Sequence, residues 1–169
     1  ASDAQYNTRV GTNAGNSFDG TNALRNTLIG YNAGTSITGA DDNTLVGYQA
    51  GDAITTGQEN TFMGRDCGGA TDTGRSNVAL GYESFLVNTT GSYNVAIGYE
   101  SLRSNTTANS NSALGEGALR NTTTGAQNTA VGRDALFNNT TASDNTAVGF
   151  RALDANTTGT ENTAVGKDA

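Results

Sequence analysis

Asn162-Thr163-Ala164-Val165-Gly166 is the last of ten copies of one pentapeptide that recurs along the whole chain. The first interval between copies is nineteen residues and the other eight are seventeen each. A fixed period of this length is typical of a solenoid, in which each repeat is one coil stacked on its neighbours. We therefore expect an all-β fold, a parallel β-solenoid (β-roll) of about ten 17-residue coils, forming a single domain over residues 1–169.

Two columns of the repeat are invariant between copies. With the repeat numbered from its asparagine, Asn128 is position 1, Gly132 is position 5, and Ala126 and Gln127 are positions 16 and 17 of the preceding coil. An asparagine can bond its own turn and stack as an amide ladder, and a glycine permits positive φ where a strand ends. A ligand or ion site is the alternative for the asparagines, but ten repetitions suit a structural role better. The expected structural ladder comprises Asn26, Asn43, Asn60, Asn77, Asn94, Asn111, Asn128 and Asn145 with Gly30, Gly47, Gly64, Gly81, Gly98, Gly115, Gly132 and Gly149.

Position 4 is apolar in every copy, from Val10 to Val165. Successive residues of a strand point to opposite faces, so positions 2 and 4 share one face and positions 1, 3 and 5 share the other. We expect position 4 to form the inward face of a short strand.

Positions 3 and 9 trade side-chain volume between copies. The second to fourth copies place a large residue at position 3 and glycine at position 9, as in Leu28 with Gly34, whereas the fifth to ninth invert this, as in Ala130 with Leu136. Close-packed interiors penalise both voids and overfilled sites, so the two positions should touch, within a coil or between chains. The fourth copy has Gly68 at position 9 and a polar residue at position 12, and we expect it to be the weakest coil.

Apolar residues at both position 3 and position 4 give the strand two apolar faces, although a roll has only one interior. Another surface must cover the second face. We therefore expect a homotrimer of rolls, or three intertwined chains, in preference to a monomer.

Composition excludes several classes of protein. Only 34% of residues are apolar, too few for a conventional globular core, and the net charge is −7 with nine scattered Lys and Arg. No basic stripe is present to neutralise phosphates, so we expect no nucleic-acid partner. The longest apolar runs, such as Phe85-Leu86-Val87, are too short for membrane insertion. The chain begins without Met and stops at position 8 of a coil, so we expect it to be a fragment of a longer array.

The sequence offers little catalytic chemistry. It has no histidine, which excludes His-dependent triads, and its single Cys67 occupies position 8, where alanine or serine otherwise stands. We expect Cys67 to be a small buried side chain. We expect no catalytic residues, no metal site and no cofactor; carboxylates such as Asp41 and Asp42, or Glu83 and Glu100, form only a weak candidate glycosidase pair.

Position 6 carries a column of aromatic and basic residues immediately after the glycine. Exposed rings and cations could stack on sugars and pair with acidic glycans, or the rings could simply cover one another and stabilise the stack. The candidate glycan-binding residues are Tyr31, Tyr48, Arg65, Tyr82, Tyr99 and Arg133.

Positions 12 to 15 form a second turn of the Asn-Thr-Thr-Gly type, as in Asn156-Thr157-Thr158-Gly159. Six asparagines at positions 11 and 12 are formal glycosylation acceptors, but turn chemistry explains them without sugar. They are Asn88, Asn105, Asn121, Asn138, Asn139 and Asn156.

These repeats resemble those of phage tail-fibre and bacterial surface proteins. The pentapeptide is also similar to the Asn-Ser-Val-Ala-Ile-Gly core of trimeric autotransporter adhesin heads, and the resemblance extends from Asn7 to Ala169. It implies a left-handed parallel β-roll assembled as a trimer. It further implies an extracellular fibre segment, on a virion tail fibre or a bacterial cell surface, that presents a surface to a glycan or protein receptor.

Three functions are thus open. The leading prediction is a structural and adhesive fibre segment that provides reach, rigidity and receptor display, with self-association into trimers or filaments. An ice-binding solenoid is the alternative, although Thr at positions 13 and 14 are adjacent and should face opposite ways. A polysaccharide-degrading tailspike would need a carboxylate pair lining a groove.

Overall fold

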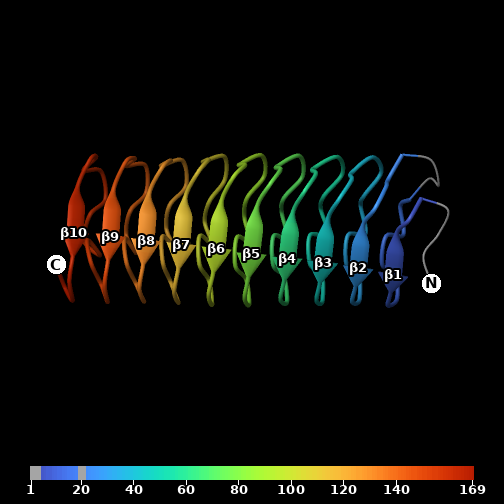
Figure 1. Ribbon diagram of the computed structural model, residues 1–169, viewed down its shortest axis with the longest axis horizontal. Coiled ribbons are helices and arrows are strands. Elements are labelled where there is room, and N and C mark those ends of the chain that lie inside the picture. The colour runs from blue at the N-terminus through green and yellow to red at the C-terminus, as the bar shows by residue number, and fades with distance from the viewer. Residues whose placement is uncertain (1–4, 19–21) are drawn as a thin grey trace.

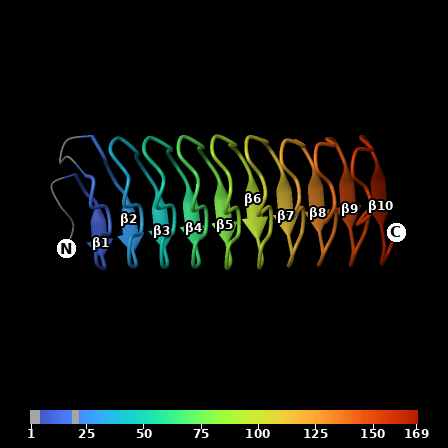
Figure 2. The same cartoon turned by 180° about the vertical axis from the view of Figure 1, so that it is seen from behind.

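The computed structural model describes residues 5–18 and 22–169, which form one straight rod of stacked coils (Figure 1). Each coil contributes one three-residue strand, and the described residues contain no helix. The strands form a single sheet in chain order, and each pairs in parallel with the next, as Thr44 does with Thr61. The same order is seen from behind in Figure 2. The predicted parallel β-solenoid is confirmed. The strands are β1 (Thr8–Val10), β2 (Thr27–Ile29), β3 (Thr44–Val46), β4 (Thr61–Met63), β5 (Val78–Leu80), β6 (Val95–Ile97), β7 (Ser112–Leu114), β8 (Thr129–Val131), β9 (Thr146–Val148) and β10 (Thr163–Val165).

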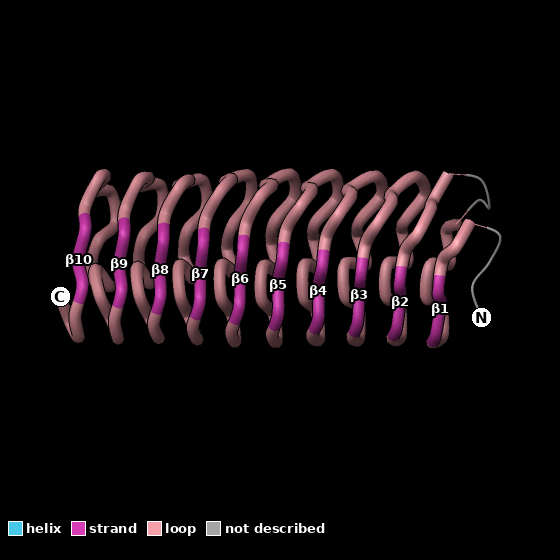
Figure 3. Tube along the Cα trace, in the orientation of Figure 1, coloured by secondary structure: helices cyan, strands magenta, loops and turns pink. Residues whose placement is uncertain are grey.

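Backbone conformation at both ends keeps each strand short. Position 17, just before the asparagine, is left-handed, with φ of 59° at Asp42 and at Glu59. Position 5, just after the strand, is a glycine with φ of 143° at Gly47 and 144° at Gly64. Turns and bends make up the rest of the coil (Figure 3).

The strand face that turns inward is the one that carries positions 1 and 3. Leu28, Leu45 and Phe62 at position 3 are fully buried, whereas Ile29 and Leu114 at position 4 are 39% and 48% exposed. The prediction that position 4 faces inward was wrong. Position 1 shares a face with position 3, and its amide ladder lies in the dry interior, so position 4 must point outward.

Positions 3 and 9 share one space, as their volumes predicted. A Cβ atom added to Gly68 would lie 2.3 Å from the ring of Phe62, and one added to Gly34 would lie 3.0 Å from the side chains of both Leu28 and Leu45. In the inverted coils the large residue is at position 9, and Leu136 is fully buried. The shared space lies inside a single chain, so contact between chains is not needed to fill it.

Position 9 is also left-handed in every described coil, a feature that volume alone does not reveal. The φ angle is 57° at Gly34 and 52° at Leu136. A left-handed residue with a side chain costs about 1–2 kcal/mol, so the inverted coils accept backbone strain and bury a leucine or phenylalanine in return.

The fourth coil, expected to be the weakest, receives extra volume from its own strand. Phe62 fills the space beside Gly68 and packs against Phe85 of the next coil, with 6.3 Å between ring centroids. Thr71 at position 12 is fully buried and accepts a hydrogen bond from Nδ2 of Asn88. The core therefore runs through this coil without a break.

The asparagines of position 1 form the predicted amide ladder. Nδ2 of Asn43 donates to Oδ1 of Asn26 (3.1 Å) and to the carbonyl oxygen of Gly57 in its own coil (3.0 Å). The backbone N–H of Asn43 donates to the same Oδ1 of Asn26 (3.0 Å). Because the residues are buried, each coil is fixed in register on the one before it by bonds that water cannot replace.

A second buried ladder runs along position 12, which the sequence interpretation had treated only as a turn. Nδ2 of Asn105 donates to Oδ1 of Asn88 (2.9 Å), and Nδ2 of Asn156 donates to Oδ1 of Asn139 (3.2 Å). The carbonyl oxygen at position 15 of the same coil accepts the other Nδ2 hydrogen, as that of Ala108 does from Asn105. Asn88, Asn105 and Asn139 are fully buried and closed to sugar in the folded chain.

The first coil keeps its register despite two additional residues. Thr8 pairs with Thr27, and Nδ2 of Asn7 donates to the carbonyl oxygen of Ala23, the equivalent of position 15. The additional residues therefore fall between Phe18 and Ala23, a segment in which residues 19–21 lie outside the described part of the chain.

Candidate functional site

The position 6 residues form a continuous exposed file along one edge of the strand sheet. Tyr31 and Tyr48 stack with ring centroids 5.3 Å apart and an interplanar angle of 11°, and Tyr82 and Tyr99 stack at 5.4 Å and 7°. Arg65 lies between the two pairs, with its guanidinium carbon 5.6 Å from the Tyr48 centroid and 5.5 Å from the Tyr82 centroid. The structure thus brings the first five candidate glycan-binding residues together.

Arg133, the sixth candidate, belongs to a separate part of the file. Glu116 stands between Tyr99 and Arg133, and its Oε2 lies 3.8 Å from Nε of Arg133. Beyond it, Arg133 and Lys167 lie over the ring of Phe150, at 5.7 Å and 6.0 Å from the centroid.

The ring faces of this file are largely used by its own members. A sugar stacks on the face of an aromatic ring, but here those faces are covered along the rod by the next tyrosine or by Arg65. Tyr48 and Tyr82 have a partner on both faces, and Tyr31 and Tyr99 have one on a single face. The geometry therefore favours stabilisation of the stack as the role of these residues.

Beside the position 6 file, acidic and basic residues of positions 7 and 10 form a ridge. Arg103 Nε lies 2.9 Å from Glu83 Oε2 and 3.6 Å from Glu100 Oε1, and Arg120 Nε lies 2.5 Å from Glu100 Oε2. Hydrogen bonds from the Tyr82 hydroxyl and from Arg103 hold the pKa of Glu83 below its usual value. This ridge ties three successive coils together through charge-assisted bonds.

In each candidate glycosidase pair, one carboxylate is held in its charged form by a neighbouring donor. Such a pair needs one carboxyl group whose pKa is raised. A hydrogen bond from Arg25 instead lowers the pKa of Asp42, whose Oδ1 lies 2.6 Å from Arg25 Nε, and Asp41 accepts a hydrogen bond from the backbone of Leu24. Glu83 and Glu100 belong to the ridge described above.

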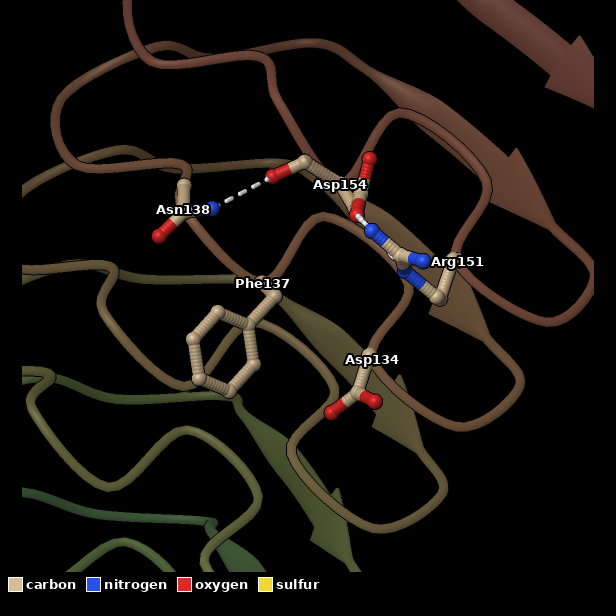
Figure 4. A pocket seen from close by; sticks show the side chains of 5 residues that line it. All are labelled: Asp134, Phe137, Asn138, Arg151 and Asp154. Carbon is tan, nitrogen blue, oxygen red and sulfur yellow. Dashed lines mark hydrogen bonds and ion pairs between the residues drawn. The ribbon is translucent and has the colours of Figure 1, made fainter. Parts of the chain in front are cut away.

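A hollow of about 280 Å³ lies on the ridge side of the eighth and ninth coils (Figure 4). Three of its polar residues are already paired with one another: Arg151 forms bonds of 2.6 Å and 2.8 Å to Asp154 Oδ2, and Asn138 Nδ2 donates to the carbonyl oxygen of Asp154 at 2.9 Å. Phe137 and Asp134 complete the lining. A ligand would have to break the Arg151–Asp154 pair to bind there.

A second hollow, of about 240 Å³, lies on the opposite turn of the third and fourth coils. Sequence interpretation missed it, because half of its residues come from position 16, where no residue type recurs strictly. The lining residues are Thr56, Gln58, Thr73 and Arg75.

The outward face of the sheet is an uninterrupted stripe of uncharged side chains. It consists of position 4, apolar in every coil, and position 2, which is Thr, Val or Ser. Val46, Leu80 and Ile97 are partly buried by their neighbours, and Ile29 and Met63 are exposed. We call this surface, positions 2 and 4 of β1 to β10, the outer stripe.

Cys67 occupies the core, as predicted. Its thiol is fully buried and lies 3.1 Å from the carbonyl oxygen of Ala79, where Ser84 makes the equivalent bond to Ala96. Burial raises the pKa of Cys67 to about 12, so the thiolate that would react is suppressed.

The described residues contain no cluster of three or more His, Cys, Asp or Glu side chains placed to hold a metal ion. They also form no helix able to cross a membrane. No family model, curated protein or solved structure matches the chain.

Proposed function

We propose that this chain is a structural and adhesive segment of an extracellular fibre, as in a phage tail fibre or a bacterial surface adhesin. The observation that carries the proposal is the continuous stacking of ten strands along one axis. At about 4.8 Å per coil, such a stack gives a rod of roughly 50 Å. A rod of this kind provides reach and stiffness and displays equivalent side chains at regular intervals.

Stiffness is supported by the density of bonds between successive coils. Backbone ladders, the position 1 amide ladder and the position 12 ladder all run parallel to the rod axis. Bending would have to stretch these bonds on one side, and the buried ones have no water to replace them.

The outer stripe supports self-association, and we propose a trimer, as the resembled adhesin heads form. A copy of the same chain is the occupant that fits best, because the stripe runs the whole length of the rod and carries no charge from β1 to β10. In a protein with net charge −7, this is a face on which two copies can meet without bringing like charges together. Only Arg9 of β1 carries charge on a strand, at position 3.

Mass measurement by light scattering tests this assembly. The expected mass is three times the chain mass of 17.2 kDa, with a rod-like profile in small-angle scattering. Leu114→Lys should give monomers with an unchanged β-sheet spectrum, because position 4 points outward and charge is costly in an apolar interface. Thr107→Lys, on the exposed turn, is the matched control and should remain trimeric. A folded parent that stays monomeric at high concentration would rule out the trimer.

Ice binding is a second candidate, favoured by one observation. Thr at positions 13 and 14 do not face opposite ways as expected: Thr89 and Thr90 are both exposed, because this part of the coil is a bend and not a strand. Position 14 forms an exposed file of seven threonines. A thermal hysteresis assay decides, since a fibre segment should show no activity and an ice-binding one should lose it on Thr107→Lys. The file comprises Thr56, Thr73, Thr90, Thr107, Thr124, Thr141 and Thr158.

A further inference from the structure

Arg75 stands apart from the other cations whose pairing the structure shows. Arg65, Arg103, Arg133 and Arg151 each lie within 4.0 Å of a carboxylate. Within the described part of the chain, the guanidinium of Arg75 has no ion pair and no hydrogen bond; its backbone N–H donates to Ser92 Oγ at 3.1 Å. An unpaired guanidinium in an acidic protein is available to an anion from outside.

The groove around Arg75 is lined by uncommitted polar groups. It holds about 240 Å³ and is bounded by Thr56 and Thr73 of position 14 and by Gln58 and Arg75 of position 16. To the described residues, the side chains of Thr56, Gln58 and Thr73 make no hydrogen bond. The groove thus offers two hydroxyl groups and one amide beside the guanidinium.

Two carboxylates adjoin the lining, and both are already bonded: Asp72 accepts from Thr55 Oγ1 and Glu59 accepts from Ser76 Oγ. Arg75 is the only charged group among the lining residues themselves. The residues before and after Arg75 at position 16 are Gln58 and Ser92, and both are neutral. A guanidinium presents a planar fork of donors that matches a carboxylate in two parallel bonds.

An exposed tyrosine, Tyr93, neighbours Arg75 on the adjacent coil. The backbone N–H of Tyr93 donates to the carbonyl oxygen of Arg75 at 3.0 Å, which places the two residues side by side on adjacent coils. The side chain of Tyr93 is 59% exposed. Unlike the stacked tyrosines of position 6, Tyr93 has no ring partner among the described residues.

We propose that this groove is a subsite for one sugar residue that bears a carboxylate, such as a uronic acid. Arg75 would bind the carboxylate, and Thr56, Gln58 and Thr73 would bind the ring hydroxyls. The volume lies below the range of about 300–1,000 Å³ for drug-sized ligands and suits a single sugar ring. Hydroxyl and amide groups dominate the lining, which favours a polyol over the side chains of an acidic peptide. The inference deepens the receptor-display part of the proposed function and requires no self-association.

A matched pair of probes tests the site. Methyl β-glucuronide and methyl β-glucoside differ only in a carboxylate that replaces a hydroxymethyl group. Each sugar is titrated to millimolar concentration while NMR follows the amide chemical shifts. The glucuronide should shift the amide signals of residues from Thr56 to Arg75 and of Tyr93, and the glucoside should bind at least tenfold more weakly. Binding of the glucuronide should weaken as salt is added.

Substitutions locate the binding. Arg75→Gln should weaken glucuronide binding about tenfold or more and leave the melting temperature unchanged, since its side chain supports no other residue. Arg25→Gln, whose guanidinium is already paired with Asp42, is the control and should bind like the parent. The proposal is overturned if the glucuronide causes no shifts, if the glucoside binds equally, or if Arg75→Gln binds as well as the parent. None of these outcomes depends on the mass measurement that tests the trimer.

Discussion

At the scale of single residues, buried amide groups hold this fold together. Asn43 shows the pattern of position 1: Oδ1 accepts from the next coil, and Nδ2 donates both to the preceding coil and to its own turn. Asn26, Asn60, Asn77, Asn94 and Asn128 repeat it. Burial of a polar group is tolerated only when its bonds are made, so a break in either ladder should be measurable.

One such break lies at Asn105. Its Oδ1 is the one buried side-chain polar atom without a hydrogen-bond partner among the described residues. Position 12 of the next coil is Thr122, and its hydroxyl donates to the carbonyl oxygen of Asn139 instead. Thr122→Asn should supply the missing Nδ2 donor and still accept from Asn139. We expect the variant's free energy of unfolding to rise by about 1 kcal/mol and its melting temperature to rise by about 2–4 °C.

The matched control for this repair is Thr124→Asn, the same change at an exposed site two residues away. It should leave the melting temperature within error of the parent. An unchanged melting temperature for Thr122→Asn would show that Asn105 Oδ1 carries no penalty.

The glycines of position 5 provide a second prediction. A Cβ atom on Gly132 would lie 2.4 Å from the carbonyl oxygen of Gly149, whereas one on Gly166 would meet no atom closer than 3.7 Å. Both glycines have φ near 130–139°, so both substitutions to alanine strain the backbone. Gly132→Ala should lower the free energy of unfolding, measured with urea, by about 1–3 kcal/mol more than Gly166→Ala does. The reason is that only Gly132→Ala also pushes two coils apart. If both variants lose the same free energy of unfolding, the close approach of adjacent coils is not the reason for glycine at position 5.

At the scale of the coil, the sequence predicted the packing partners but not the direction of the strand face. The reciprocal volumes of positions 3 and 9 were enough to place Leu28 beside Gly34, since volume is conserved in a shared space. Alternation along the strand also separated positions 3 and 4 correctly. Hydrophobicity alone could not say which face is inside, because Leu45 and Val46 are both apolar. The decisive feature was Asn43, whose amide ladder needs a dry interior.

The position 12 ladder and the groove at Arg75 were also beyond prediction. Asn88 and Asn105 follow the pattern of an exposed Asn-Thr-Thr turn, and only the path of the coil shows that their amides point inward. The groove at Arg75 depends on which side chains remain unpaired, and that depends on neighbours seventeen residues away.

Coupling between positions 3 and 9 can be measured with a double-mutant cycle in the eighth coil. Leu136→Gly removes a fully buried leucine and should cost about 2–5 kcal/mol, reduced by relief of its left-handed strain. Ala130→Leu alone should overfill the same space and cost about 1–3 kcal/mol. Together they rebuild the pairing of Leu45 with Gly51, so the double variant should be at least 1 kcal/mol more stable than the sum of the single losses predicts. Strict additivity would contradict a shared space.

The ridge of ion pairs makes stability depend on pH. Tyr82 and Arg103 lower the pKa of Glu83 in the folded chain. Ionised Glu83 therefore adds to the free energy of unfolding above its unfolded pKa of about 4.3, and this stabilisation is lost as the pH falls through the folded pKa. The parent should therefore melt at a higher temperature than Glu83→Gln at pH 7, and this difference in melting temperature should shrink below about pH 4. Glu161→Gln, at an exposed residue, is the control and should show no such convergence.

At the scale of the whole molecule, the rod is a one-dimensional array. Each strand contacts only the strands before and after it, and the sheet order follows the chain. Stability is then a sum of coil terms and interfaces between neighbours, and the array has no fixed length. Any set of seventeen residues that matches its neighbours can in principle be removed or added.

Removal of residues 94–110 tests this directly. Asn111 then follows Tyr93 and takes the place of Asn94 on the amide ladder, with Ala113 over Ala79 and Leu119 over Phe85. Arg120 takes the place of Arg103 beside Glu83, so the ridge is also rebuilt. We expect a folded rod one coil shorter, with a melting temperature within a few degrees of the parent and the same β-sheet spectrum per residue.

Removal of residues 94–109 is the matched control, because it differs by a single residue. The remaining Ser110 stands directly before Asn111, beside the strand, whereas the first coil carries its two additional residues in the turn between Phe18 and Ala23. It should therefore shift the later coils by one position relative to the first five, and a slip of one residue exchanges the two faces of a strand. Leu114 and Val131 would then point inward, and Asn111 and Asn128 would lose their places in the ladder. This variant should lose its later coils, seen as a smaller β-sheet signal and rapid proteolysis beyond residue 93. If both deletions fold equally well, the seventeen-residue register does not hold the rod together.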